Sequence, residues 1–251
     1  MTAIARLTRA ELRKLATTRA FLTTLAIAIA LAVISVAVTA ATAGKNGTPA
    51  LGTDASTYQM LKLGVVSSLA MLVLGIIASG GEYRHRTIIP AMLITPRRGA
   101  LIAAKAIAVA IAGVVLSSLT FGLGLATAVA ELHSHGISTL PSGTVGLFAG
   151  SVAAATLFGL IGVALGYITR STVAAVVGAV GWVLFAEYAI LRTLAPQLAK
   201  WLISGTAVTL TSPPGPSSGA PTLITAVAVL GGYTVVLLAI ATRLALRRDL
   251  T

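Results

Sequence analysis

The six acidic side chains of this 251-residue chain are the first candidates for chemistry, and they lie far apart in the sequence. They are Glu11, Asp54, Glu82, Glu131, Glu187 and Asp249. A membrane enzyme that acts on activated lipids would usually need clustered acids to hold a metal ion. A proton- or sodium-coupled carrier would need several ionisable groups inside its membrane spans. Only Glu187 lies well inside an apolar segment, so the pattern of acids argues against both functions.

Other motifs for chemistry are also missing from the sequence. No GxxxxGK[ST] phosphate-binding loop occurs, so the chain does not bind ATP by that route. The absence of cysteine excludes disulfides and thiolate metal sites. His133 and His135 lie close to Glu131 and could hold a metal, but on a Gly- and Ser-containing loop they are better explained as solvated side chains. We therefore predict no catalytic, cofactor or metal site in this chain.

The densest polar segment is Gly80–Lys105, which reads GGEYRHRTIIPAMLITPRRGALIAAK. Glu82 is its one acid, and long apolar runs flank it. Its basic residues are Arg84, Arg86, Arg97, Arg98 and Lys105. A segment this polar cannot lie in lipid, so it must connect two membrane helices on the cytoplasmic side. It is either an ordinary basic loop or an element that passes movement of a soluble partner into the membrane.

The overall composition indicates an integral membrane protein. Of the chain, 57% is hydrophobic and only 10% charged, whereas a soluble domain carries about a quarter charged residues. The net charge of +12 could indicate nucleic acid in a soluble protein. Here the basic residues cluster at the ends of apolar segments, where they mark the cytoplasmic side and meet anionic lipid.

We expect an all-α integral membrane protein whose residues 1–251 form one transmembrane domain. A helix needs about 20 apolar residues to span a bilayer. The apolar runs predict six spans, at about 20–42, 58–79, 99–130, 143–168, 173–191 and 222–244. The third run is longer than a bilayer needs, so we expect it to begin in the cytoplasm with Lys105 near the head groups. Lys62, at the outer end of the second run, can snorkel to the interface.

Residues 1–19 predict an amphipathic helix that lies in the membrane interface. Its apolar side carries Ile4, Leu7, Leu12 and Leu15, and Arg6, Arg9 and Arg13 lie opposite. Glu11 falls on the apolar side. Two interpretations are open for this acid: an ion pair with Lys14 at position i+3, or a contact with a cytoplasmic partner.

The basic residues predict the orientation of the chain. With both termini in the cytoplasm, all but four of the 18 Lys and Arg residues fall on the cytoplasmic side. The four on the outer side are Lys45, Lys62, Arg192 and Lys200.

Glu187 is an acid inside the fifth predicted span, about one turn from Arg192. We favour a structural pair of these two residues near the outer interface. An acid within a span is nevertheless a functional candidate by default. The pairs Gly146/Gly150 and Gly162/Gly166 have GxxxG spacing, which allows close approach of helices without identifying the partner helix.

Two segments carry a resemblance to a known family. They are TRAELRKLATTRA (Thr8–Ala20) and GEYRHRTIIPAMLITPRRGALIAAK (Gly81–Lys105). In these motifs the chain resembles the membrane-spanning permease subunits of ABC-2 type ATP-binding-cassette transporters, particularly the short six-helix actinobacterial form. The six-span topology is consistent with this resemblance but would not be specific by itself.

The resemblance implies particular site residues. The connection between spans two and three would form a coupling helix that sits in a groove of a separate cytoplasmic ATPase. The coupling residues would be Glu82, Tyr83, Arg84, His85, Arg86 and Thr87. Arg97 and Arg98 would orient the return into span three, and the interfacial helix would contribute Glu11, Arg13 and Lys14. Short re-entrant helices would lie between spans five and six, at Ala195–Gly205, although Pro213–Pro216 lengthens the loop beyond the family pattern.

The resemblance also implies a function. The chain would be a non-enzymatic permease subunit in the plasma membrane, working with a second permease and with ATPase subunits that bind ATP and Mg. Its cargo would be a hydrophobic or amphipathic compound, such as a drug, peptide or lipid-linked molecule, and export is favoured over import. The alternatives are a signalling or assembly subunit that transports nothing, an ion-coupled secondary carrier and, last, a membrane enzyme.

Overall fold

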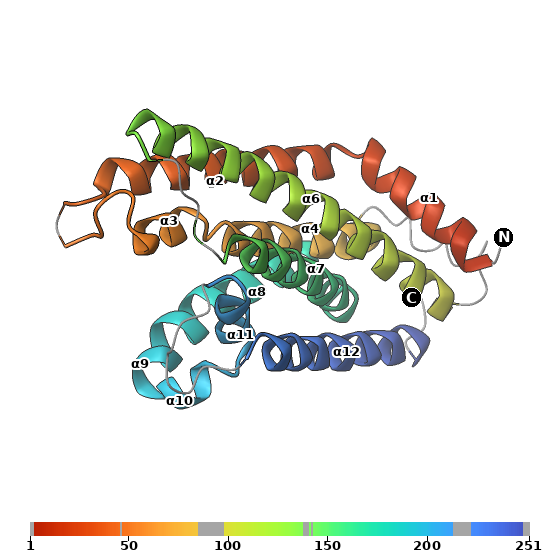
Figure 1. The fold of residues 1–251 in the computed structure, drawn as a ribbon. Helices are drawn as coiled ribbons and strands as arrows, with labels where there is room; N and C mark the ends of the chain where they lie inside the picture. The colour runs from red at the N-terminus through yellow and green to blue at the C-terminus, as the bar shows by residue number, and fades with distance from the viewer. Residues whose placement is uncertain are drawn as a thin grey trace.

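The computed structural model describes residues 3–45, 47–84, 98–137, 141, 143–212 and 222–247, and every regular element within these ranges is a helix. Figure 1 shows long helices running side by side with a cluster of short ones at one end. The expectation of an all-helical membrane protein is confirmed for this part of the chain.

Five helices in the described ranges are long and apolar enough to cross a membrane. They are α2 (Arg19–Thr42), the pair α3 (Asp54–Met60) and α4 (Gly64–Arg84) taken together, α6 (Arg98–Ser134), α7 (Thr144–Thr169) and α12 (Leu223–Arg247). The sequence predicts six such spans. The five observed helices indicate a multi-pass membrane protein. One of the six predicted spans is not among them.

The exception is the fifth predicted span, residues 173–191. The structure divides it into α8 (Thr172–Gly181) and a π-helical segment, η1 (Trp182–Leu191), which continues into α9 (Arg192–Leu194). The apolar helical part of this segment is Thr172–Glu187, which is shorter than each of the five membrane-spanning helices named above. π-Helical turns are rare and occur frequently at functional sites.

The ends of two helices differ from the sequence expectation. Helix α4 continues to Arg84, so Glu82 and Tyr83 belong to its last turn and not to a loop. Helix α6 continues to Ser134, so Glu131 and His133, predicted in a loop, are helical. Both helices project beyond their apolar runs, because an α-helix satisfies its own backbone groups in water as well as in lipid. Of the predicted coupling residues, Glu82, Tyr83 and Arg84 thus belong to α4, and the rest of the predicted coupling helix lies outside the described residues.

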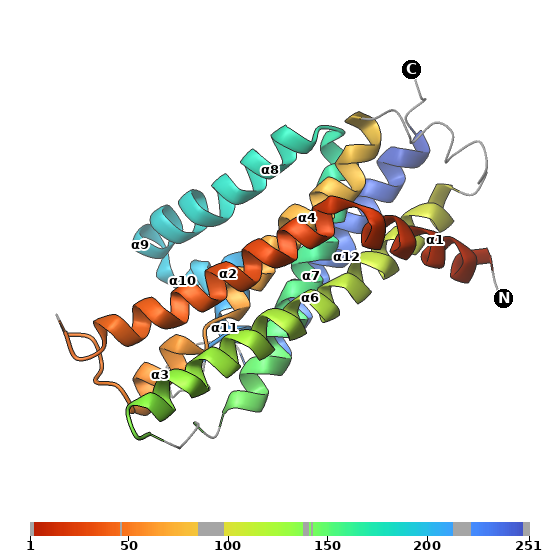
Figure 2. The same cartoon turned by 90° about the horizontal axis from the view of Figure 1, so that it is seen from above.

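Helix α1 (Ala3–Thr17) precedes α2 and is separated from it by Thr18, whose backbone is extended (φ −82°, ψ 136°). Figure 2 shows α1 lying across the start of α6, at an angle to α2. Arg6, Arg9 and Arg13 are exposed, whereas Leu12 and Leu15 are partly covered. The helix thus presents its basic side outward and its apolar side to the rest of the protein.

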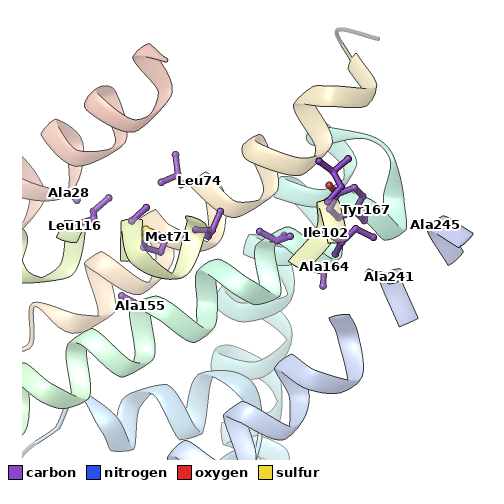
Figure 3. Packing of buried hydrophobic residues seen from close by; sticks show 14 residues of the cluster. Ala28, Met71, Leu74, Ile102, Leu116, Ala155, Ala164, Tyr167, Ala241 and Ala245 are labelled. Carbon is purple, nitrogen blue, oxygen red and sulfur yellow. The ribbon is translucent and has the colours of Figure 1, made fainter. Parts of the chain in front are cut away.

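Helices α4 and α7 form the closest contact of the core. A Cβ atom at Gly75 would lie 2.1 Å from the Gly159 carbonyl oxygen, and one at Gly162 would lie 2.2 Å from the Leu72 carbonyl oxygen. Gly159, Gly162 and Gly166 of α7 therefore serve contact with α4. Figure 3 shows Met71 of α4 and Ala155 and Ala164 of α7 in the largest buried cluster of the described residues, with α6 contributing Ile102 and Leu116.

Replacing Gly162 by alanine tests this contact. The new methyl group would meet backbone on α4, which cannot move aside as a flexible side chain would, and overpacking of this kind costs about 1–3 kcal/mol. We expect a lower midpoint of thermal unfolding in detergent. Gly146→Ala is the matched control, because nothing lies within 4 Å of its Cβ position. Equal midpoints for both variants would contradict the close approach of α4 and α7.

Candidate functional site

Four charged side chains from three helices meet at the end of the bundle where α1 lies. Helix α1 supplies Glu11 and Lys14, three residues apart and therefore on one face. The last turn of α4 supplies Glu82, and Lys105 lies two turns into α6. We call Glu11, Lys14, Glu82 and Lys105 the charge cluster.

Lys105 lies at the centre of the charge cluster. Its Nζ atom is 2.5 Å from Glu11 Oε2 and 2.9 Å from Glu82 Oε1. The Lys14 ammonium also contacts Glu82 Oε1. Lys105 is 1% exposed and Glu82 3% exposed, whereas the side chains of Glu11 and Lys14 are 12% and 45% exposed. Two acids and two bases balance, so the cluster has no net charge.

A buried ion pair stabilises a fold little in total, because desolvation of the charges offsets their attraction. Separating the partners would leave each charge buried and unpaired, which costs much free energy. The ion pair therefore holds the two helices that carry it in one relative position. Here the pairs fix the end of α4 and the start of α6 to each other and to α1. These two helix ends border residues 85–97 on both sides.

A cavity of about 340 Å³ adjoins the charge cluster. All four cluster residues line it, and its apolar wall includes Leu15, Leu74, Ile77 and Ala78. The second carboxylate oxygen of Glu82, Oε2, is buried and has no hydrogen-bond partner among the described residues. The cavity thus joins an apolar wall to charged groups with capacity for further hydrogen bonds.

Tyr83 connects the end of α4 to the end of α7. Its ring meets the ring of Tyr167 edge-on, with centroids 6.2 Å apart and planes at 84°. The guanidinium carbon of Arg170 lies 5.5 Å from the centre of the Tyr83 ring, a cation–π contact. Arg170 ends α7 in the left-handed conformation (φ 54°), so the turn into α8 and the end of α4 are positioned together.

The structure brings together only part of the predicted coupling set. Glu82 is buried in the charge cluster, Tyr83 is half-buried and Arg84 is exposed. His85, Arg86 and Thr87 lie outside the described residues. A direct contact of Glu82 with another protein would require the cluster to open.

One of the two interpretations left open for Glu11 is not observed among the described residues. Glu11 pairs with Lys105 on another helix, and not with Lys14 at i+3. Lys105, expected near the head groups, is buried among protein groups, and its depth in the membrane stays a prediction. A signal was present in the sequence: Lys105 is the one charge in a long apolar run, and Glu11 and Glu82 flank neighbouring predicted spans. Arg13, by contrast, is exposed as expected.

Glu187 forms a second polar site, at the other end of the bundle. It is 1% exposed and accepts hydrogen bonds from Trp182 Nε1 at 2.5 Å and from the Ser204 backbone N–H at 2.6 Å. Ser204 belongs to the first turn of α11 (Ile203–Leu210), where a carboxylate satisfies a free backbone donor and the helix dipole. The predicted partner, Arg192, lies outside the described side chains.

Substitution of Glu187 separates a structural from a transport role. Glu187→Leu leaves the Trp182 and Ser204 N–H groups without an acceptor, and each buried unpaired group costs about 1–3 kcal/mol. We expect a clearly lower thermal midpoint for Glu187→Leu and a small change for Glu187→Gln, whose amide oxygen still accepts one bond. Loss of transport in Glu187→Gln at an unchanged midpoint would instead place the acid in the transport pathway.

The connection after η1 contains short helices, as the resemblance implies for Ala195–Gly205. They are α10 (Pro196–Ala199) and α11. Helix α11 packs into the bundle: Thr206 and Leu210 are buried, and Gly150 of α7 approaches the Leu210 carbonyl oxygen. The chain therefore turns back into the domain before α12 begins.

Two further cavities lie around α11 and η1. One, of about 320 Å³, has mainly apolar walls that include Leu72, Phe158 and Trp182. The other, of about 450 Å³, is lined by Lys62, Ser68 and Thr211 together with apolar residues.

No group of three His, Cys, Asp or Glu side chains suited to a metal ion occurs within the described ranges.

Comparison with protein families matches residues 7–186 to a family described as ABC-2 family transporter protein. The match covers most of the chain and includes the charge cluster, Tyr83 and Arg170. Comparison with curated proteins finds no match.

Proposed function

The chain belongs to the ABC-2 family of transporter proteins, and from this we propose that it is the permease subunit of an ATP-driven exporter. Separate cytoplasmic ATPase subunits bind ATP and Mg. A second permease, either a copy of this chain or a relative, completes the pathway.

The observation that carries this proposal is the position of the charge cluster. It joins α1, the end of α4 and the start of α6 at both borders of residues 85–97. An ATPase that moves this connection displaces the ends of α4 and α6 together, and α1 moves with them. Such a joint suits rigid-body rocking of packed helices, by which a cavity changes the side to which it opens.

The gathering of basic helix ends supports cytoplasmic termini in the plasma membrane. Figures 1 and 2 show α1, the end of α4, the start of α6 and the end of α12 at the same end of the bundle. Arg13, Arg84, Arg170 and Arg243 belong to this end, which the positive-inside rule assigns to the cytoplasm. With α8, η1 and α9 taken together as one crossing, the chain crosses the membrane six times and both termini share a side.

The cargo in this proposal is a hydrophobic or amphipathic compound, such as a drug, a peptide or a lipid-linked molecule. Support comes from the apolar cavity beside η1 and from its larger neighbour, where Lys62 and several hydroxyl groups add polar contacts. Ligand pockets are usually apolar with a few polar groups.

The first test is affinity purification of the tagged chain in mild detergent, followed by mass spectrometry. We expect a stoichiometric ATPase subunit, and the same preparation reveals any second permease. A clean preparation without an ATPase, also after gentle crosslinking, would overturn the proposal. Stimulation of ATP hydrolysis by a cargo then distinguishes a transporter from a signalling or assembly subunit that uses the same ATPase contact.

A further inference from the structure

The cavity beside the charge cluster has the composition of a binding site for an amphipathic ligand. Leu15, Leu74, Ile77 and Ala78 form an apolar wall. The four residues of the charge cluster, from α1, α4 and α6, also line the cavity. Its volume of about 340 Å³ lies at the lower end of the roughly 300–1,000 Å³ typical of small-molecule sites, so it accommodates a head group and the first part of a chain.

The hydrogen bonds of Glu82 define what such a ligand must offer. Both lysines contact Oε1, whereas Oε2 is buried without a partner in the described part of the chain. A buried carboxylate oxygen needs an N–H or O–H donor, and an unmet one is costly. The ligand therefore carries a donor, and an ammonium with N–H groups suits an anionic acceptor best.

Charge balance adds a second requirement. The charge cluster is neutral by itself, so a ligand that brought only a cation would leave a net charge beside the buried Glu82 and Lys105 side chains. An anionic group on the same ligand removes this cost. Lys14 is the group to receive it, because its side chain is 45% exposed and has donors beyond the one used by Glu82.

The geometry points to a binding site for phosphatidylethanolamine, a lipid with a primary ammonium and a phosphate in its head group. The ammonium donates to Glu82 Oε2, the phosphate accepts from Lys14, and the start of an acyl chain lies along Leu15, Leu74 and Ile77. Phosphatidylcholine offers no N–H donor, and phosphatidylglycerol brings a net negative charge. The site belongs to the bundle end with the basic residues, which places the lipid in the leaflet on that side.

The test uses the full-length chain in phosphatidylcholine nanodiscs, with a phosphatidylethanolamine that carries a photoreactive group near the start of one acyl chain. We expect crosslinks to the apolar wall of the cavity, found by mass spectrometry of peptides. Unlabelled phosphatidylethanolamine should compete about tenfold better than phosphatidylcholine or phosphatidylglycerol, the effect of one hydrogen bond to a charged group. Equal competition by the three lipids would overturn the assignment.

Three variants and a soluble competitor sharpen this test. Lys14→Gln removes the phosphate partner from a half-exposed position, and we expect labelling to fall severalfold, as in Glu82→Gln. Arg9→Gln removes an exposed cation of the same helix that does not line the cavity, and labelling should stay unchanged. Equal loss in Arg9→Gln would show general attraction to the membrane surface instead of a site.

Glycerophosphoethanolamine, the free head group, distinguishes the source of the ligand. It lacks the chains that contact Leu15, Leu74 and Ile77, so it should compete far more weakly than the lipid. Equal competition would assign the site to a soluble phosphoamine and overturn the lipid assignment. None of these measurements needs ATP or a partner subunit, so their outcome is independent of the proposed transport function.

Discussion

Replacing Lys105 by methionine is expected to cause the largest loss of stability of any single substitution in the charge cluster. The side chain is 1% exposed and contacts both Glu11 and Glu82. Methionine keeps most of the length, being one atom shorter, but removes the charge, which leaves two carboxylates close together with only the half-exposed Lys14 to offset them. Breaking a buried ion pair in this way costs about 3–5 kcal/mol. We expect a much lower yield of folded protein and a lower thermal midpoint.

Two matched variants separate unpaired charge from lost packing. Lys45→Met removes an exposed lysine that bonds only a nearby backbone carbonyl among the described residues, and surface charges of this kind contribute little. The triple variant Lys105→Met, Glu11→Gln, Glu82→Gln removes the acids with the lysine and should recover a large part of the lost stability. If the triple variant is as unstable as Lys105→Met alone, the charge cluster does not explain the effect.

Hydrophobic run length predicts most of the fold. Span four, expected at 143–168, is observed as Thr144–Thr169, and span six, expected at 222–244, as Leu223–Arg247. These boundaries follow from composition, because a spanning helix needs about 20 apolar residues and the polar residues that follow them are stable in water but not in lipid. Run length does not predict the type of helix at 173–191, where composition remains apolar through η1 and nothing in the hydropathy marks a change from α- to π-helical turns.

The charge cluster was not predictable in the same way. Glu11 and Lys105 are 94 positions apart, so their contact depends on how α1 lies across α6 and not on any local spacing. Local spacing in fact favours Lys14 as the partner of Glu11, and tertiary packing overrides it. A lone lysine in an apolar run and two acids at nearby helix ends restrict the possible pairs, but do not assign them.

The resemblance predicts the role of segments better than that of single residues. It directs attention to Gly81–Lys105 and to α1, which the structure joins through the charge cluster. It also treats Glu82 as a residue that meets the ATPase directly, although this carboxylate is buried against two lysines of its own chain. We therefore propose that Glu82 acts within the permease, by holding the end of α4 to α1 and α6.

Glu82→Gln is accordingly expected to uncouple the transporter without dismantling it. The amide keeps the shape of the carboxylate, Lys105 retains Glu11 as its partner, and Lys14 can turn into water. Stability should fall only modestly, but the end of α4 is no longer held by charge to α1 and α6. We expect ATP hydrolysis by the purified complex to continue while cargo transport falls by about tenfold, the equivalent of a coupling free energy of about 1.4 kcal/mol.

Arg84→Gln is the contrasting variant, because Arg84 is exposed two residues further along the same helix. A residue that meets the ATPase directly should, when changed, reduce the amount of ATPase that purifies with the chain. Glu82→Gln should leave that amount unchanged and instead lengthen the distance between spin labels placed on α4 and α6. If Glu82→Gln releases the ATPase while the α4–α6 distance stays constant, the carboxylate works at the subunit interface, and the charge cluster must open when the ATPase binds.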